Sequence, residues 1–306
     1  MNKKIELMPG IIADPVTVET KAGIIEYSLT GSNGPVVMVV HGGLGGYDQA
    51  RVMAARWINE NNFRILCPSR PGYLGTPLES GRSMEEQADL FASLLDHLGI
   101  EKVVVVSASA GGPPGYVFAM RHPERVSAMI AIDSVSGYYD LPEKVGPVAE
   151  ALFLNSFGQK LTSMMEKISP ASFLKQLFVT EAYYTKEQMK THIDFALNTP
   201  SALEFVDAFM NTMYPYKPRK AGTDNDMAIY RTYTRLPLSG IQCPTLIIHG
   251  THDADVKFYD GVYAYESIEG AERHWIEFGS HVGFWVSPGS AAAQKHAAAF
   301  LERHAG

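Results

Sequence analysis

The sequence predicts an α/β protein whose β-sheet is mostly parallel and whose chain is interrupted by a helical insertion. Three observations predict this class. Short β-branched runs alternate with helical stretches through the first 136 residues, the alternation stops between residues 137 and 238, and it resumes near residue 245. Hydrophobic residues make up 46% of the 306 residues and charged residues 19%, so the chain is long and apolar enough to bury a large core.

The first part of the chain supplies five predicted strands and three predicted helices. The strands are short apolar or β-branched runs, far too short to cross a bilayer, and are expected at residues 24–29, 36–40, 63–67, 103–106 and 126–132. The helices are expected at residues 48–61, 83–98 and 110–121. Ser83 and Glu86 have the spacing of a capping box, and Gly99 ends the second helix. Strands joined through helices pair in parallel.

Helical patterns rich in methionine and aromatic residues dominate residues 137–238, with stretches at 148–167, 171–178 and 186–197. Beyond them we expect strands at 245–249 and 273–278 and helices at 256–268 and 288–304. We therefore predict a core domain of residues 1–136 and 239–306 with an insertion of residues 137–238. Both ends of the insertion must return to the same sheet.

The charge and cysteine content exclude several classes of protein. Lys and Arg total 26 and Asp and Glu total 33, a formal net charge of −7 without a basic cluster, which argues against a nucleic-acid partner or an anionic membrane surface. Two cysteines far apart, Cys67 and Cys243, cannot form a disulfide framework or a zinc site. The N-terminus lacks the apolar core of a signal peptide. We expect a reduced, cytoplasmic protein without a membrane span.

A serine lies on a predicted strand-to-helix turn. Residues 107–112 read Ser-Ala-Ser-Ala-Gly-Gly, between the predicted strand at 103–106 and a helix. Such a turn forces the central Ser109 outward, and its neighbours two positions away, Ser107 and Gly111, must be small because the turn brings them together. This is the nucleophile-elbow pattern with Ser in place of the first Gly. A small-residue loop without chemistry is the alternative.

A glycine-rich turn, His41-Gly-Gly-Leu-Gly-Gly46, follows the predicted strand at 36–40. Backbone N–H groups of such a turn can face a cleft and stabilise an oxyanion. The residues fit neither common phosphate-binding glycine pattern, and His41 is expected to be structural.

Two further strand ends carry an acid and a base. Asp253 follows the predicted strand at 245–249, and His281 follows the one at 273–278. Taken singly, Asp253 could cap a helix and His281 could be an ordinary loop histidine. The order Ser…Asp…His is that of the α/β-hydrolases rather than of the chymotrypsin or subtilisin families.

The chain resembles the α/β-hydrolase superfamily, in its esterase and lipase-like branch with a helical cap. Besides the segments above, the resemblance rests on residues 70–76 (Arg-Pro-Gly-Tyr-Leu-Gly-Thr), 122–126 (His-Pro-Glu-Arg-Val) and 244–250 (Pro-Thr-Leu-Ile-Ile-His-Gly). It implies an α/β-hydrolase fold with an eight-stranded, mostly parallel sheet flanked by helices, and a cap (lid) at residues 137–238.

By the same resemblance Ser109 is the nucleophile, His281 the base and Asp253 its acid, with Asp133 as an alternative acid. The backbone N–H groups of Gly43 and Ala110 would form the oxyanion hole, with Leu44 as a third donor. A Ser at the nucleophile position excludes the aspartate-dependent dehalogenases and epoxide hydrolases.

The leading prediction is a carboxylic ester hydrolase for small hydrophobic substrates, working through an acyl-enzyme without metal or organic cofactor. A carbon–carbon bond hydrolase, a lactonase, a perhydrolase, an amidase-like peptidase or a hydroxynitrile lyase would use much the same residues. A non-catalytic ligand-binding member of the fold also stays open. The oligomeric state is not predicted.

Overall fold

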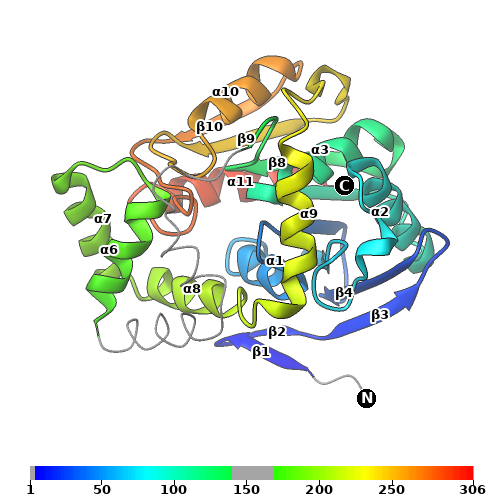
Figure 1. Ribbon diagram of the computed structural model, residues 1–306, viewed down its shortest axis with the longest axis horizontal. Helices are drawn as coiled ribbons and strands as arrows, with labels where there is room; N and C mark the ends of the chain where they lie inside the picture. The colour runs from blue at the N-terminus through cyan, green and yellow to red at the C-terminus, as the bar shows by residue number, and fades with distance from the viewer. Residues whose placement is uncertain (1–3, 140–168, 306) are drawn as a thin grey trace.

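The computed structural model describes residues 4–139 and 169–305, and an eight-stranded sheet lies at its centre (Figure 1). In spatial order the strands are β10 (Glu272–Ile276), β9 (Thr245–Gly250), β8 (Val126–Ile132), β7 (Val103–Ala108), β5 (Val36–Val40), β6 (Arg64–Pro68), β4 (Ile24–Thr30) and β3 (Pro15–Glu19). Within this sheet of the described residues, β4 runs opposite to the other seven strands. The predicted α/β fold with a mostly parallel eight-stranded sheet is confirmed.

Side chains alternate between the two faces of the sheet, and each face is covered by helices. Val37, Val39, Val104 and Val106 belong to one apolar cluster, whereas Val36, Met38, Val103 and Val105 belong to the other. The first cluster packs against α1 (Tyr47–Ala54) and α11 (Ser290–His304), and the second against α2 (Met84–Leu98), α3 (Gly112–Arg121) and α10 (Phe258–Ser267). Burial on both faces explains why the central strands are continuous apolar runs.

Helix α2 has the predicted ends. The Ser83 hydroxyl accepts a hydrogen bond from the Glu86 N–H at 3.2 Å, the Glu86 carboxylate accepts one from the Ser83 N–H at 2.9 Å, and Gly99 takes a left-handed φ of 65°. Helix α1 is shorter than the predicted 48–61, because Ala55 is extended and Arg56 has a φ of 70°. The predicted helix at 110–121 likewise begins only at Gly112, after a 3₁₀ turn over Ser109–Gly111.

The N-terminal strands were not predicted. β1 (Ile5–Met8) and β2 (Ile11–Ala13) form a separate antiparallel hairpin, and β3 adds an edge to the main sheet. These strands are short and mostly only half-buried, so their sequences lack the long apolar run that identifies the central strands. The last strand, β10, ends at Ile276 rather than 278, and Phe278 has a positive φ of 55°.

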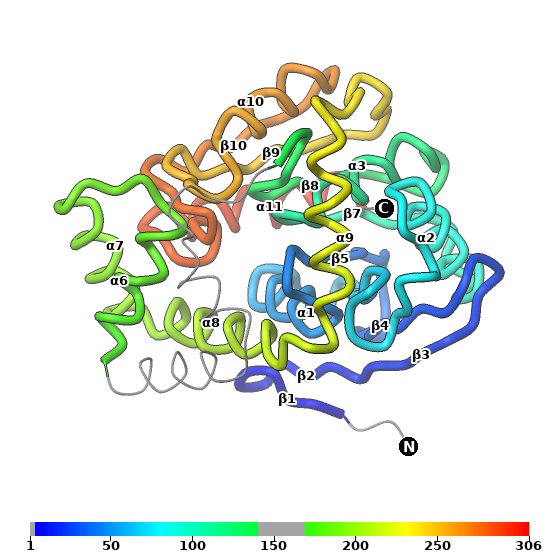
Figure 2. Tube along the Cα trace, in the orientation of Figure 1, coloured from blue at the N-terminus to red at the C-terminus, as the bar shows by residue number. Residues whose placement is uncertain are grey.

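Four helices of the described chain lie between β8 and β9: α6 (Pro170–Glu181), α7 (Lys186–Asn198), α8 (Pro200–Asn211) and α9 (Lys220–Tyr230). α6 and α7 match predicted helices, α8 and α9 were not singled out, and the predicted helix at 148–167 falls outside the described residues. Figure 2 shows α6, α7 and α8 on the side away from α2 and α3, and α9 crossing from α8 towards the segment that leads to β9. Within the described ranges, no helix has the length and apolar character needed to cross a membrane.

Candidate active site

The strand order places the candidate site at the middle of the sheet. β5 pairs in parallel with β6 on one side and with β7 on the other, so the chain order reverses at β5. Val40 lies opposite Ser107 in this pairing, and the segments that follow β5 and β7 therefore emerge side by side. Ligands of open α/β sheets bind at such reversal points, beyond the carboxyl ends of the strands.

Ser109 stands on a strained turn directly after β7, with a φ of 53°. The residues around this turn are closely packed against neighbouring segments. A Cβ on Gly111 would lie 2.5 Å from the His41 carbonyl oxygen, and one on Gly115 would lie 2.9 Å from the Ser107 Cβ. A larger side chain at Gly111 would therefore clash with the end of β5, and one at Gly115 of helix α3 would clash with Ser107.

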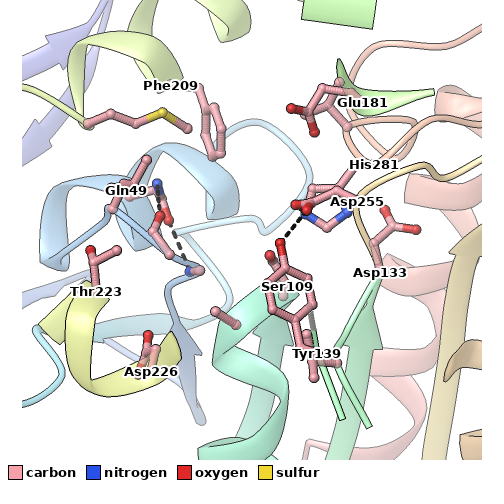
Figure 3. Close-up of a pocket in the computed structure, with 18 of the residues that line it drawn as sticks. Gln49, Ser109, Asp133, Tyr139, Glu181, Phe209, Thr223, Asp226, Asp255 and His281 are labelled. Atoms are coloured by element: carbon pink, nitrogen blue, oxygen red, sulfur yellow. Dashed lines mark hydrogen bonds and ion pairs between the residues drawn. The ribbon is translucent and has the colours of Figure 1, made fainter. Parts of the chain in front are cut away.

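The glycine turn after β5 leaves two backbone donors without a partner among the described residues. Gln49 accepts a hydrogen bond from the Gly42 N–H at 2.9 Å and donates one to the Gly43 carbonyl at 3.3 Å (Figure 3). The Gly43 and Leu44 N–H groups donate no hydrogen bond to any residue that the structure describes, and both residues line the same cavity as Ser109 and Ala110. His41 is fully buried behind this turn rather than in the cavity.

The predicted acid and base are in contact. The His281 Nδ1 lies 2.8 Å from the Asp253 Oδ2, and the Asp253 carboxylate is fully buried. The other carboxylate oxygen, Oδ1, accepts hydrogen bonds from the N–H groups of Asp255 and Val256, at 2.9 and 3.0 Å. Asp253 therefore caps a turn and holds the imidazole at the same time. Burial favours the neutral form of Asp253, but the two histidines beside it, His281 and His249, outweigh burial and lower its pKa.

Asp133, the alternative acid, lies close by but makes no hydrogen bond to His281. Its Oδ1 accepts a hydrogen bond from the Gly250 N–H at 2.7 Å, and burial raises its pKa to about 7. His249 lies between the carboxyls, with its Nε2 3.5 Å from the Asp253 Oδ2 and 4.0 Å from the Asp133 Oδ1. Of the two acids that the sequence offered, Asp253 is therefore the one that contacts His281.

Three further polar side chains surround His281, and sequence reasoning missed them. The Asp255 Oδ2 lies 3.3 Å from the His281 Nε2, and the Tyr139 hydroxyl donates to the Asp255 Oδ1 at 2.5 Å. Figure 3 shows these residues and Glu181 grouped with Ser109 and His281 on one side of the cavity. Asp255 is only two residues from Asp253 and could have been noticed, whereas Glu181 comes from α6, where nothing in the sequence points to the site.

Asp255 takes the position at His281 that a nucleophile would need. Within residues 4–139 and 169–305, Ser109 makes no hydrogen bond to His281, although both side chains line one cavity. Burial lowers the pKa of His281, but the carboxylates of Asp253 and Asp255 outweigh it and raise the pKa well above its ordinary value. Burial and the neighbouring Asp255 raise the pKa of Glu181 to about 8.

The cavity has a volume of about 590 Å³, and its walls come from the segments that follow the central strands and from the helices between β8 and β9. Most of its lining surface is apolar and includes Leu44, Met53, Leu177, Phe209, Met213 and Trp285. Polar side chains stand on two sides, with one group around His281 and another opposite it that includes Gln49, Thr223 and Asp226 (Figure 3). Two groups of side chains could offer metal ligands. One consists of Asp133, His249 and Asp253, of which Asp133 lines the cavity, and the other consists of Glu181, Asp255 and His281, all of which line it. Each group is also held by the hydrogen bonds and ion pairs given above.

Comparison with known proteins identifies the class. The profile of the α/β-hydrolase-fold family matches residues 35–288, and the chain belongs to this family. A solved α/β-hydrolase-fold protein from Nakamurella multipartita superimposes with a TM-score of 0.88 at 34% identity, covering 94% of this chain and 98% of that one.

Two curated relatives extend the comparison. An uncharacterised hydrolase of Bacillus subtilis (strain 168) is 28% identical over 94% of this chain and 98% of its own length. A 2-hydroxy-6-oxononadienedioate/2-hydroxy-6-oxononatrienedioate hydrolase of Cupriavidus pinatubonensis is 23% identical over 88% of this chain and 89% of its own length. The protein is therefore a hydrolase of the α/β fold.

Proposed function

We propose that this chain hydrolyses carboxylic esters of small hydrophobic substrates through a covalent acyl-enzyme. One observation carries the proposal: the Asp253–His281 pair, 2.8 Å apart, opens on a cavity that is also lined by a strained serine and by the glycine turn after β5. The largely apolar lining favours a hydrophobic substrate. The helices between β8 and β9 contribute part of this lining, and we assign residues 137–238 the role of a cap over the cavity.

The reaction begins when the His281 Nε2 accepts the proton of Ser109, whose oxygen then attacks the substrate carbonyl. The carbonyl oxygen becomes an oxyanion that the N–H groups of Gly43 and Ala110 stabilise, with Leu44 as a third donor; removing one such donor typically costs about 3–4 kcal/mol. The protonated His281 gives its proton to the leaving alcohol. Water then attacks the acyl carbonyl while His281 takes its proton; the bond between the acyl carbon and the Ser109 oxygen breaks, His281 returns the proton to Ser109, and the carboxylic acid leaves.

Asp255 must give up its contact with the His281 Nε2 before this first proton transfer. Because a base works only when neutral, and Asp255 with Asp253 favours the charged imidazolium, His281 is expected to deprotonate above the usual value of about 6.5. Asp255 is thus a competitor of Ser109 for the same nitrogen.

This competition predicts the pH dependence of the enzyme. In the wild type, kcat/KM is expected to fall on the acid side with a midpoint above pH ~6.5, and Asp255→Asn is expected to move that midpoint to lower pH because it removes one charge facing His281. Glu181→Gln is the control: with a pKa of about 8, Glu181 is mostly neutral below pH 7, so this variant should shift the midpoint less. The measurement is kcat/KM for a p-nitrophenyl ester from pH 5 to 9 in all three proteins. An unchanged midpoint in Asp255→Asn would contradict the competition between Asp255 and Ser109 for the His281 Nε2.

The carbon–carbon bond hydrolase is the second candidate, because the Cupriavidus relative named for that reaction matches most of the chain. A substrate panel of p-nitrophenyl acyl esters, lactones and dienoic ketones, combined with labelling by a fluorophosphonate, separates the two. We expect the highest kcat/KM on an ester and a covalent adduct on Ser109. Faster turnover of the dienoic ketone would favour the second candidate, and neither turnover nor adduct would leave the chain a ligand-binding member of the fold.

A further inference from the structure

We propose that Arg70, held by Asp226, is a positioning residue that fixes the direction of the Gly43 N–H. This inference rests on the proposed function, since it concerns the oxyanion hole. Arg70 follows β6 and Asp226 lies on α9, and the two side chains form an ion pair whose exposed fractions are 0% and 5%. Neither residue attacks the substrate or transfers a proton in the proposed reaction.

The first step is the geometry of one peptide unit. The Gly42 carbonyl and the Gly43 N–H belong to the same planar peptide, so they point in opposite directions when the peptide is trans. The Gly42 oxygen accepts a hydrogen bond from the His41 Nδ1 at 2.7 Å and another from the Arg70 Nη2 at 3.2 Å. Both donors are buried. Holding the carbonyl toward them directs the Gly43 N–H the other way, and that N–H has no partner among the described residues.

The tautomer of His41 supports this assignment. The backbone N–H of Arg70 donates to the His41 Nε2 at 2.9 Å, so Nε2 is an acceptor and the ring proton is on Nδ1. Burial and the charge of Arg70 lower the pKa of His41 well below its ordinary value, which keeps the ring neutral. His41 can therefore donate only one hydrogen bond, and it donates it to the Gly42 oxygen.

The guanidinium is itself held on both sides. The Arg70 Nε donates to the His41 carbonyl at 3.2 Å, while Nη1 and Nη2 bind the two oxygens of Asp226 at 2.8 and 2.6 Å. The Tyr73 hydroxyl also donates to Asp226, at 2.6 Å. A planar guanidinium that makes a two-point contact with a carboxylate has little freedom to turn. In such a chain of hydrogen bonds each bond polarises the next, which strengthens the Gly43 N–H as a donor.

Besides the Gly42 carbonyl, the Arg70 side chain holds only the His41 carbonyl among the polar backbone atoms of the turn that have a partner in the described residues. Gln49 holds the Gly42 N–H and the Gly43 carbonyl, and Figure 3 shows Gln49 and Asp226 on the side of the cavity opposite His281. Loss of the guanidinium therefore leaves the turn anchored by Gln49 and by the His41 ring, but it weakens the hold on the Gly42 carbonyl, which shares its peptide with the Gly43 N–H. That selectivity makes the proposal testable.

Arg70→Lys is the primary variant, and Arg219→Lys is its matched control. Arg219 is also buried, pairs with Asp48 at 2.7 Å and donates to a carbonyl of the same turn, but that carbonyl belongs to Gly45 and not to the Gly42–Gly43 peptide. A lysine keeps the charge in both variants but cannot make the forked contact. Arg70→Met combined with Asp226→Met, which removes both buried charges together, gives a second variant if the first does not fold.

Three quantities are measured: kcat, KM, and the kcat/KM for an ester divided by the kcat/KM for the matching thionoester. The sulfur of the thionoester accepts hydrogen bonds poorly, so this ratio reports hydrogen bonding to the substrate oxygen. We expect Arg70→Lys to lower kcat by about 10- to 100-fold, with KM changed less than about 3-fold and the ester-to-thionoester ratio reduced in step with kcat. Arg219→Lys is expected to keep kcat and the ratio, whatever it does to the melting temperature. A folded Arg70→Lys enzyme with unchanged kcat and ratio overturns the proposal.

A crystal structure of Arg70→Lys makes the test independent of turnover. A rotated Gly42–Gly43 peptide supports the positioning role, and an unrotated peptide overturns it even if the wild type hydrolyses esters. The wild type could also fail to turn over esters and fail to react with a fluorophosphonate. If the Gly42–Gly43 peptide of Arg70→Lys is nevertheless rotated, the proposed function is overturned but the positioning role of Arg70 is supported.

Discussion

Ser109→Ala is expected to lower kcat for p-nitrophenyl esters by at least about 10⁴-fold, because the oxygen that forms the acyl-enzyme is removed. The substitution keeps the Ser109 Cβ and therefore its packing against Gly42, so the fold should persist. This packing is close, because a Cβ added at Gly42 would lie 3.2 Å from the Ser109 Cβ. The same variant should no longer gain mass from a fluorophosphonate. Circular dichroism and the melting temperature verify that the protein is folded.

Ser107→Ala is the control for this experiment. Ser107 is a fully buried serine near the end of β7, two residues before Ser109; its hydroxyl lies 3.4 Å from the Ser134 hydroxyl and has no role in the proposed reaction. Ser107→Ala should keep both turnover and labelling. If Ser109→Ala retained a tenth of the wild-type kcat, or if the adduct formed on another residue, the serine mechanism would be wrong.

Asp253→Asn is expected to lower kcat by about 10⁴-fold, whereas Asp133→Asn should cost less than about 10-fold. Asparagine at 253 keeps an oxygen for the N–H groups of Asp255 and Val256, but its amide N–H₂ faces the His281 Nδ1 and favours the wrong tautomer. At position 133, burial already holds the pKa of the carboxyl at about 7, so a neutral asparagine resembles a form that is present near neutral pH.

Comparing kcat for the two variants at a fixed pH and saturating ester checks this ranking. Both substitutions preserve side-chain shape, so a difference between them reports charge and hydrogen bonding at His281. The reverse ranking would assign the acid to the end of β8 in place of β9.

Much of the fold could be predicted because it is encoded locally. The runs at 36–40 and 126–132 are buried on both faces of the sheet and are therefore continuously apolar, and their predicted bounds match β5 and β8. Ser83, Glu86 and Gly99 mark the ends of α2 through contacts within a few residues. The helix expected at 48–61 was too long, because the break at Arg56 depends on a backbone conformation that an arginine rarely adopts and that its sequence does not signal.

The candidate site was also predictable only in part. The sequence by itself determined that Ser109, Asp253 and His281 follow strands of an α/β sheet, and parallel strands bring the residues that follow them to one edge. Only the tertiary structure decided what surrounds them. Tyr139 meets Asp255 across 116 residues and Arg70 meets Asp226 across 156, because folding brings together segments that follow β8, β9 and β6 and helix α9. Such contacts have no periodicity along the chain, and buried charges acquire their partners only when separate elements close around them.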